Sequence, residues 1–209
     1  MKRRFGLLPC LGIAAAALMI SIPASANTVT QNTSWTINRA NTSTLYRVVG
    51  YGDSIYAGYH GSISNVARRA APWADGEYAS SLWNADIEVI RRCKSGAVAS
   101  DIYNNKIVAE KSYMQDAKTR VVTFEMCGND GLQARSSFAG QSGTCSYAPL
   151  DTALANCTTY QQNAMSFINA NASANTKVKI IANLYYPGYA ADNALTNCTD
   201  ATTHAKVNK

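Results

Sequence analysis

Short apolar runs alternate with stretches of helical periodicity along this chain. Four runs rich in β-branched, aliphatic and aromatic residues predict strands, at residues 45–51, 86–92, 120–126 and 178–184. Apolar residues at helical spacing predict helices near 63–71, over 98–116 and over 150–170. Strands that alternate with helices build β-α-β units, so we expect an α/β domain whose parallel sheet is covered by helices on both faces.

The polar segments outside these elements predict loops and an incomplete domain. Residues 27–44 are rich in Asn, Thr and Ser and indicate an extended, hydrogen-bonded lead-in rather than part of the folded unit. Residues 132–149 are rich in Gly and Ser and predict a loop. After the fourth predicted strand the chain is mostly polar, which would leave a hydrophobic sheet edge uncovered. We therefore expect residues 45–209 to be the front part of a domain that continues beyond Lys209.

The first 26 residues have the organisation of an export signal. Three basic residues follow Met1, an apolar stretch spans 5–22, and small residues occupy 24–26. The apolar stretch is interrupted by proline and glycine and is short for a membrane span, so we expect cleavage after Ala26 and a secreted or periplasmic protein without a stable membrane span. Cleavage lowers the formal net charge from +6 to +3, because three basic residues are lost. So mild a charge does not indicate a nucleic-acid partner.

The cysteines indicate disulfides rather than a metal site. Six are present and Cys10 leaves with the leader, so five remain in a protein bound for an oxidising compartment. They include no C-x-x-C pair and no neighbouring histidine pair, so no metal is expected. Two pairings that would staple the loop after residue 129 are left open, Cys127–Cys145 and Cys145–Cys157. Cys198 is expected to pair beyond the end of the sequence. For Cys127, a disulfide or buried thiol is favoured over a nucleophile, since no basic residue stands beside it.

Three short polar blocks carry the candidate chemistry, and each follows a predicted strand. Ser54 ends the turn sequence Gly-Asp-Ser after strand 45–51, while Gly96 and Asn129 follow the next two strands. Because the carboxyl ends of parallel strands meet at one edge of a sheet, we expect the blocks to converge. The Ser54 hydroxyl would attack an ester carbonyl. The backbone N–H groups of Ser54 and Gly96 and the Asn129 amide would stabilise the oxyanion, without any cofactor.

These blocks resemble those of the SGNH, or GDSL-type, esterases and lipases. The matching segments are residues 52–58 (Gly-Asp-Ser-Ile-Tyr-Ala-Gly), 95–101 (Ser-Gly-Ala-Val-Ala-Ser-Asp) and 128–131 (Gly-Asn-Asp-Gly), and the resemblance covers residues 48–188. It implies a three-layer α/β/α sandwich with a flavodoxin-like parallel sheet. It also implies that Ser54 is the nucleophile, that Gly96 and Asn129 form the oxyanion hole, and that the substrates are lipid esters, short acyl esters or acyl groups on carbohydrates.

Two features depart from the family pattern. Cys127 stands where the third block usually has its first glycine, a position that we expect to accept a small residue. The closing Asp-x-x-His block, which supplies the general base and its orienting acid, is not present. The two histidines are His60, a candidate pocket residue beside the nucleophile turn, and His204, the alternative base. We expect the base beyond Lys209, and residues 27–209 alone to be nearly inactive, because a serine without a base is a poor nucleophile.

The sequence is therefore interpreted as a secreted carboxylic ester hydrolase. The alternative is a catalytically inactive secreted binding or surface protein on the same fold, which the missing base favours. Tyr56 and Tyr59, close after the nucleophile, are the aromatic residues expected in the substrate pocket. Asp53 and Asp130 are expected to be structural turn residues. The acyl group and the oligomeric state are left open.

Overall fold

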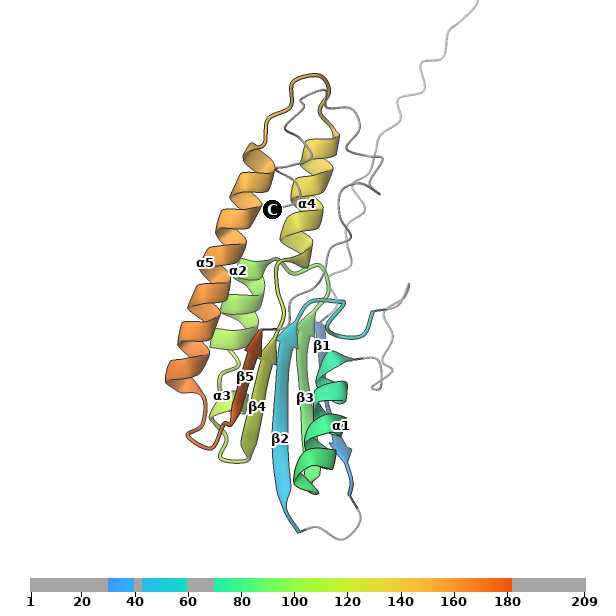
Figure 1. The fold of residues 1–209 in the computed structure, drawn as a ribbon, viewed down its shortest axis with the longest axis vertical. Helices are drawn as coiled ribbons and strands as arrows, with labels where there is room; N and C mark the ends of the chain where they lie inside the picture. The colour runs from blue at the N-terminus through green and yellow to red at the C-terminus, as the bar shows by residue number, and fades with distance from the viewer. Residues whose placement is uncertain (1–29, 40–42, 60–69, 182–209) are drawn as a thin grey trace, which may run out of the picture.

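The computed structural model describes residues 30–39, 43–59 and 70–181, which form a five-stranded mixed sheet with helices on both faces (Figure 1). The strand order is β1-β3-β2-β4-β5. Four strands run parallel, and β1 runs antiparallel to β3 at the edge. The strand bounds are Thr30–Ile37 for β1, Leu45–Gly52 for β2, Asp86–Lys94 for β3, Thr119–Phe124 for β4 and Val178–Ile181 for β5.

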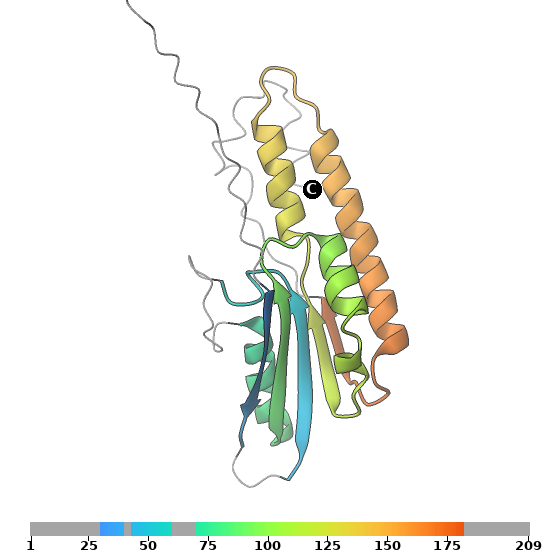
Figure 2. The ribbon, with the colours of Figure 1, turned by 180° about the vertical axis from the view of Figure 1, so that it is seen from behind.

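The helices are divided unequally between the two faces. Helix α1 packs on one face, while α2, η2, α3 and α5 pack on the other (Figures 1 and 2). Helix α4 stands beyond the carboxyl ends of the strands and runs beside α5. The helix bounds are Ala71–Trp83 for α1, Ala99–Ile102 for α2, Tyr103–Val108 for the π-helical η2, Ser112–Gln115 for α3, Gly128–Ala139 for α4 and Ala148–Asn171 for α5.

Alternate side chains of the strands enter two apolar layers. Val48 is fully buried in the layer under α1, and its neighbour Val49 is fully buried in the layer under α5. Phe124 at the end of β4 joins the second layer, together with Ile168 of α5. Full burial of such a side chain contributes about 1.5–3 kcal/mol. The two layers therefore fix the strand ends from which the candidate site is built.

Two glycines of β2 allow the chain to fold back tightly after the strand. A Cβ on Gly50 would lie 2.2 Å from Cγ of Pro72, in the first turn of α1. A Cβ on Gly52 would lie 2.6 Å from Cβ of Tyr56. Interiors are packed too densely to absorb such overlaps. The start of α1 and the turn that carries Ser54 therefore rest directly on the backbone of β2.

The structure confirms most of the elements predicted from the sequence. All four strands are present, and so is the long helix α5. The predicted helix over 98–116 is broken into α2, η2 and α3. The predicted helix near 63–71 lies almost wholly outside the described residues. Helix α1 was not predicted, although Pro72 in its first turn is a helix-start signal.

The prediction that residues 27–44 lie outside the folded unit is wrong for residues 30–37, which form β1. This strand pairs along β3 in antiparallel register, so the sheet is mixed rather than wholly parallel. Trp35 and Ile37 pack in the layer beside α1, while Ser34 and Thr36 are exposed. Such an alternation is typical of a strand with one apolar face.

The prediction of a loop over 132–149 is wrong for its first half, because α4 continues to Ala139. Ala134 and Phe138, four residues apart, are the buried side chains of this helix. The Gly, Asn and Ser residues around them are weak helix formers, which explains why the composition suggested a loop.

Candidate active site

The three polar blocks all lie at the carboxyl edge of the sheet. Ser54 follows β2, Gly96 follows β3, and Asn129 lies in the first turn of α4, after β4. Because β2 is paired in parallel with both β3 and β4, these three ends meet at one edge. All three residues are partly exposed rather than buried.

The side chain of Asn129 links the other two blocks. Its Nδ2 donates to Oδ2 of Asp53 at 3.0 Å and to the carbonyl oxygen of Ala97 at 2.9 Å. Asp53 precedes Ser54 and Ala97 follows Gly96, so one amide group joins the nucleophile turn to the glycine loop. The structure thus brings together the three blocks that the sequence analysis singled out.

The turn after β2 presents Ser54 at its corner. Asp53 Oδ1 accepts the N–H of Ile55 at 2.8 Å, which is an Asx-turn contact, and the Ser54 carbonyl accepts the N–H of Tyr59 at 2.8 Å. Within the described residues, no hydrogen bond engages the Ser54 hydroxyl. The backbone contacts therefore hold the turn in place, and they do not involve the Ser54 hydroxyl.

Two backbone donors are available beside it. The N–H groups of Ser54 and Gly96 form no hydrogen bond within the parts of the chain that the structure describes. Gly96 has a φ of 73°, a left-handed conformation that glycine adopts without penalty. The Asn129 amide differs from these donors, because both of its hydrogens are engaged by Asp53 and Ala97. It can serve an oxyanion only by exchanging one of those contacts.

A second contact holds the glycine loop to α4. Asp130 Oδ2 accepts the N–H of Ala99 at 2.7 Å, at the first residue of α2. Burial raises the pKa of this carboxyl, and hydrogen bonds to it act in the opposite direction. Asn129 and Asp130 therefore both anchor the loop around Gly96, one through a carbonyl and the other through an N–H.

Sequence reasoning missed a buried acid behind this site. Glu125 directly follows β4 and is fully buried, and its Oε2 accepts the N–H of Asp53 at 3.2 Å. Burial, reinforced by the charge of Asp53, raises the pKa of Glu125 to about 9. Burial also raises the pKa of Asp53. The signal was present in the sequence as an acidic residue inside the apolar run at 120–126.

The cysteines pair differently from either alternative left open. Cys127 is bonded to Cys157, which ties the start of α4 to the middle of α5. Cys145 is also in a disulfide. Cys93 is a buried free thiol opposite Gly52, and burial raises its pKa.

Cys127 also has an unusual backbone. Its φ is 86°, a left-handed conformation that a side chain disfavours. Glycine, which the family pattern has at this position, adopts it freely. The expectation that the position accepts a small residue is therefore incomplete, because its backbone conformation favours glycine and Cys127 is also tied down by its disulfide.

The two tyrosines after Ser54 differ in location. Tyr56 is buried, and its hydroxyl bonds with Thr123 and with Asp75, at 3.3 Å to the latter. The prediction that Tyr56 lines a substrate pocket is wrong, because its ring fills the space between β2 and α1. Tyr59 is 43% exposed, and its place in a pocket stays a prediction.

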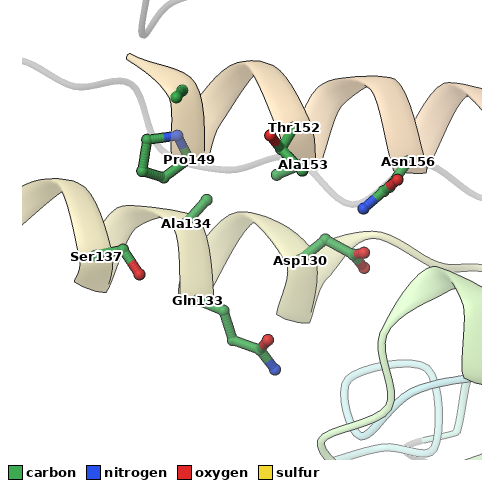
Figure 3. A pocket seen from close by; sticks show the side chains of 9 residues that line it. Asp130, Gln133, Ala134, Ser137, Pro149, Thr152, Ala153 and Asn156 are labelled. Atoms are coloured by element: carbon green, nitrogen blue, oxygen red, sulfur yellow. The ribbon is translucent and has the colours of Figure 1, made fainter. Parts of the chain in front are cut away.

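A shallow groove of about 390 Å³ lies between α4 and α5, next to the site (Figure 3). Ala134 points toward α5 and Asn156 points toward α4, with Asp130 at the end of α4 that adjoins Asn129 (Figure 3). The lining mixes small apolar and polar side chains: Asp130, Gln133, Ala134, Ser137, Ala148, Pro149, Thr152, Ala153 and Asn156.

The histidines, a possible metal site and a possible membrane span are the remaining features to consider. His60 and His204 are both outside them, so the position of a general base is not described. Across residues 30–39, 43–59 and 70–181, no cluster of His, Cys, Asp and Glu could hold a metal ion. Among the described helices, none is both long and apolar enough for a membrane crossing.

Comparison of the chain with family models, with curated proteins and with solved structures found no match.

Proposed function

We propose that the protein is a secreted serine hydrolase that cleaves carboxylic esters through an acyl-enzyme on Ser54. The observation that carries this proposal is the double contact of the Asn129 amide, which places the Ser54 turn and the Gly96 loop at one point. The two segments so joined carry the Ser54 hydroxyl and the N–H groups of Ser54 and Gly96, none of which is hydrogen-bonded within the described residues. These are the groups that acyl transfer requires, apart from a base.

The chemistry follows from that arrangement. The Ser54 oxygen attacks the ester carbonyl, and the negative charge on the carbonyl oxygen is stabilised by the N–H groups of Ser54 and Gly96. The alcohol leaves, and water then hydrolyses the acyl-serine. The Asn129 amide joins as a third donor when the oxyanion replaces Ala97 or Asp53 as its acceptor. A general base must take the serine proton, and neither histidine is among the described residues.

The sheet supports the resemblance to the SGNH family. Apart from β1, the order β3-β2-β4-β5 corresponds to the order 2-1-3-4 of a flavodoxin-like sheet. Ligands of such sheets bind where the order reverses, which is between β2 and β4 here. Ser54 follows β2 and Asn129 follows β4, so both lie at this point. We infer a flavodoxin-like three-layer sandwich with an added antiparallel edge strand.

The disulfide and the groove support two further parts of the proposal. A bond such as Cys127–Cys157 is typical of proteins in oxidising compartments, which favours secretion. The groove between α4 and α5 begins next to Asn129, so we expect part of the substrate to lie in it. Its mixture of small apolar and polar side chains fits short acyl groups or carbohydrate esters at least as well as long lipid chains.

A secreted binding protein on the same fold is the second candidate. The observation that favours it is the engagement of both Asn129 amide hydrogens, which leaves the site with two free donors rather than three. Such a protein would bind an ester or a polyol without turning it over.

Ester hydrolysis by the full secreted protein separates the two candidates. We expect release of nitrophenol from nitrophenyl acetate and butyrate, with the rate reduced to background in Ser54→Ala. Ser136→Ala, an exposed serine on α4, is the matched control and should retain the wild-type rate. Binding of the ester without turnover would support the second candidate, and equal rates for wild type and Ser54→Ala would exclude Ser54 as the nucleophile.

A further inference from the structure

Glu125 joins β2 to β4 directly beneath the candidate site. Its N–H donates to the carbonyl oxygen of Tyr51 at 2.9 Å, and its Oε2 accepts the N–H of Asp53 at 3.2 Å. Glu125 thus links the end of β4, which leads to Asn129, to the end of β2, which leads to Ser54. No step of the proposed hydrolysis uses it.

One side-chain oxygen of Glu125 lacks a hydrogen-bond donor within the described residues. Its Oε1 is buried and receives no hydrogen bond within the described residues. An ionised carboxylate would leave charge there without a donor, which is costly away from water. A protonated carboxyl instead has a hydrogen to donate, and the neighbouring acid is Asp53, whose N–H already donates to Oε2 of Glu125 and whose side chain interacts with it.

Asp53 is the acceptor that this hydrogen requires. Its carboxylate already accepts hydrogen bonds from Ile55 and from Asn129, and these contacts favour its charged form. Two buried carboxyl groups in contact cannot both ionise without a large penalty, so one retains a proton. The hydrogen bonds that Asp53 receives assign the charge to Asp53 and the proton to Glu125.

We propose that Glu125 and Asp53 share one proton beneath the Ser54 turn, and that Glu125 is thereby a positioning residue for Asn129. The positioning role rests on the proposed function, whereas the shared proton does not. While the proton is present, Asp53 is held between Glu125 and Asn129. When it is lost, two adjacent carboxylates repel, and the contact that aligns the Asn129 amide is disturbed.

Several other polar and charged groups surround the Glu125–Asp53 pair and act on it. The charge of Asp130 in α4 raises the pKa of Asp53, and the N–H of Gly128 at the start of α4 lowers the pKa of Glu125. The charges of both acids raise the pKa of Cys93 in β3, and the charges of Arg91 and Lys106 lower it. Cys93 is neutral at ordinary pH, since burial raises its pKa above its usual range.

Thermal unfolding of the full protein between pH 6 and pH 10 tests the shared proton. The folded state keeps a proton on Glu125 up to about pH 9, while the unfolded chain loses it near 4.5. Between these values the folded state binds more protons, so stability falls as pH rises. Glu125→Gln keeps a donor toward Asp53 without a proton to lose. It should match the wild-type melting temperature at pH 6 and exceed it by about 4 °C or more at pH 9. Glu77→Gln, an exposed acid on α1, should keep the wild-type slope.

The outcomes distinguish this inference from the proposed function. An equal pH slope in wild type and Glu125→Gln overturns the shared proton, whether or not esters are cleaved. If the variant does not fold, the carboxyl ¹³C resonance of Glu125 in the wild type decides, with a midpoint near 9 expected and one near 4.5 contradicting the proposal. For positioning, kcat/KM should fall above about pH 9 in the wild type and not in Glu125→Gln. Parallel alkaline limbs in both proteins overturn that role. If Glu125→Gln loses the dependence of the melting temperature on pH but neither protein hydrolyses esters, the shared proton stands and only the proposed function is overturned.

Discussion

Asp53 and Asn129 lie 76 residues apart in the sequence and are joined by a hydrogen bond of 3.0 Å. The bond crosses from the turn after β2 to the first turn of α4. It forms because β2 and β4 are parallel neighbours, so their carboxyl ends share an edge. Through Asp53 it fixes the position of Ser54 relative to the amide that we assign to the oxyanion hole.

Replacing Asn129 by Ala should lower kcat by about 10²–10³, as removal of one oxyanion donor does in other hydrolases. The melting temperature should also fall by several degrees, because the buried Asp53 carboxylate loses one of its donors, so the rates are compared well below both melting temperatures. Steady-state kinetics on a nitrophenyl ester measure the effect. Asn104→Ala is the matched control, since its amide bonds only within its own helical segment, to the Ser100 carbonyl. Equal rates in the two variants would show that Asn129 does not stabilise the transition state.

The strained backbone of Cys127 can be separated from its disulfide by two double variants. Cys127→Gly with Cys157→Ser and Cys127→Ala with Cys157→Ser both lose a crosslink between residues 30 apart, which costs about 3–4 kcal/mol. The glycine variant should be the more stable of the two by about 1 kcal/mol, because alanine is disfavoured at a φ of 86°. Urea unfolding measures the difference. Equal stabilities, or a more stable alanine variant, would contradict the argument from backbone strain.

Filling the groove between α4 and α5 should weaken substrate binding without stopping the chemistry. Ala153 lines the groove, and Ala153→Trp should raise KM more for a butyrate ester than for an acetate ester, with kcat nearly unchanged. Ala155→Trp places the same ring on an exposed position of the same helix and should leave both values near wild type. An unchanged KM in Ala153→Trp would mean that the substrate does not enter this groove.

Much of the sheet could be predicted because its strands are continuous apolar runs. The β-branched and aromatic residues of segments 45–51 and 120–126 favour strands, and both segments form buried parallel strands. Residues 30–37 escaped prediction because only Trp35 and Ile37 contribute apolar side chains to the core. Helix α4 escaped because its composition favours turns, and it owes its stability to packing against α5 and to the disulfide.

In the candidate site, too, residues marked by the local sequence could be predicted, whereas roles that depend on neighbours in space could not. Ser54, Gly96 and Asn129 could be named from the sequence because each follows a recognisable strand within a few residues. The role of Glu125 could not, since it depends on which side chain the neighbouring strand places beside it. The burial of Tyr56 follows from the absence of a side chain at Gly52, a relationship between two positions rather than a property of either.

Covalent labelling of the protein with a fluorophosphonate tests the central claim most directly. The probe forms a bond between its phosphorus and the serine oxygen and releases fluoride, so peptide mass spectrometry identifies the reacting residue. We predict one adduct, on Ser54, which is absent from Ser54→Ala and much slower to form in Asn129→Ala. An adduct on another residue, or no adduct in a protein that hydrolyses esters, would contradict it.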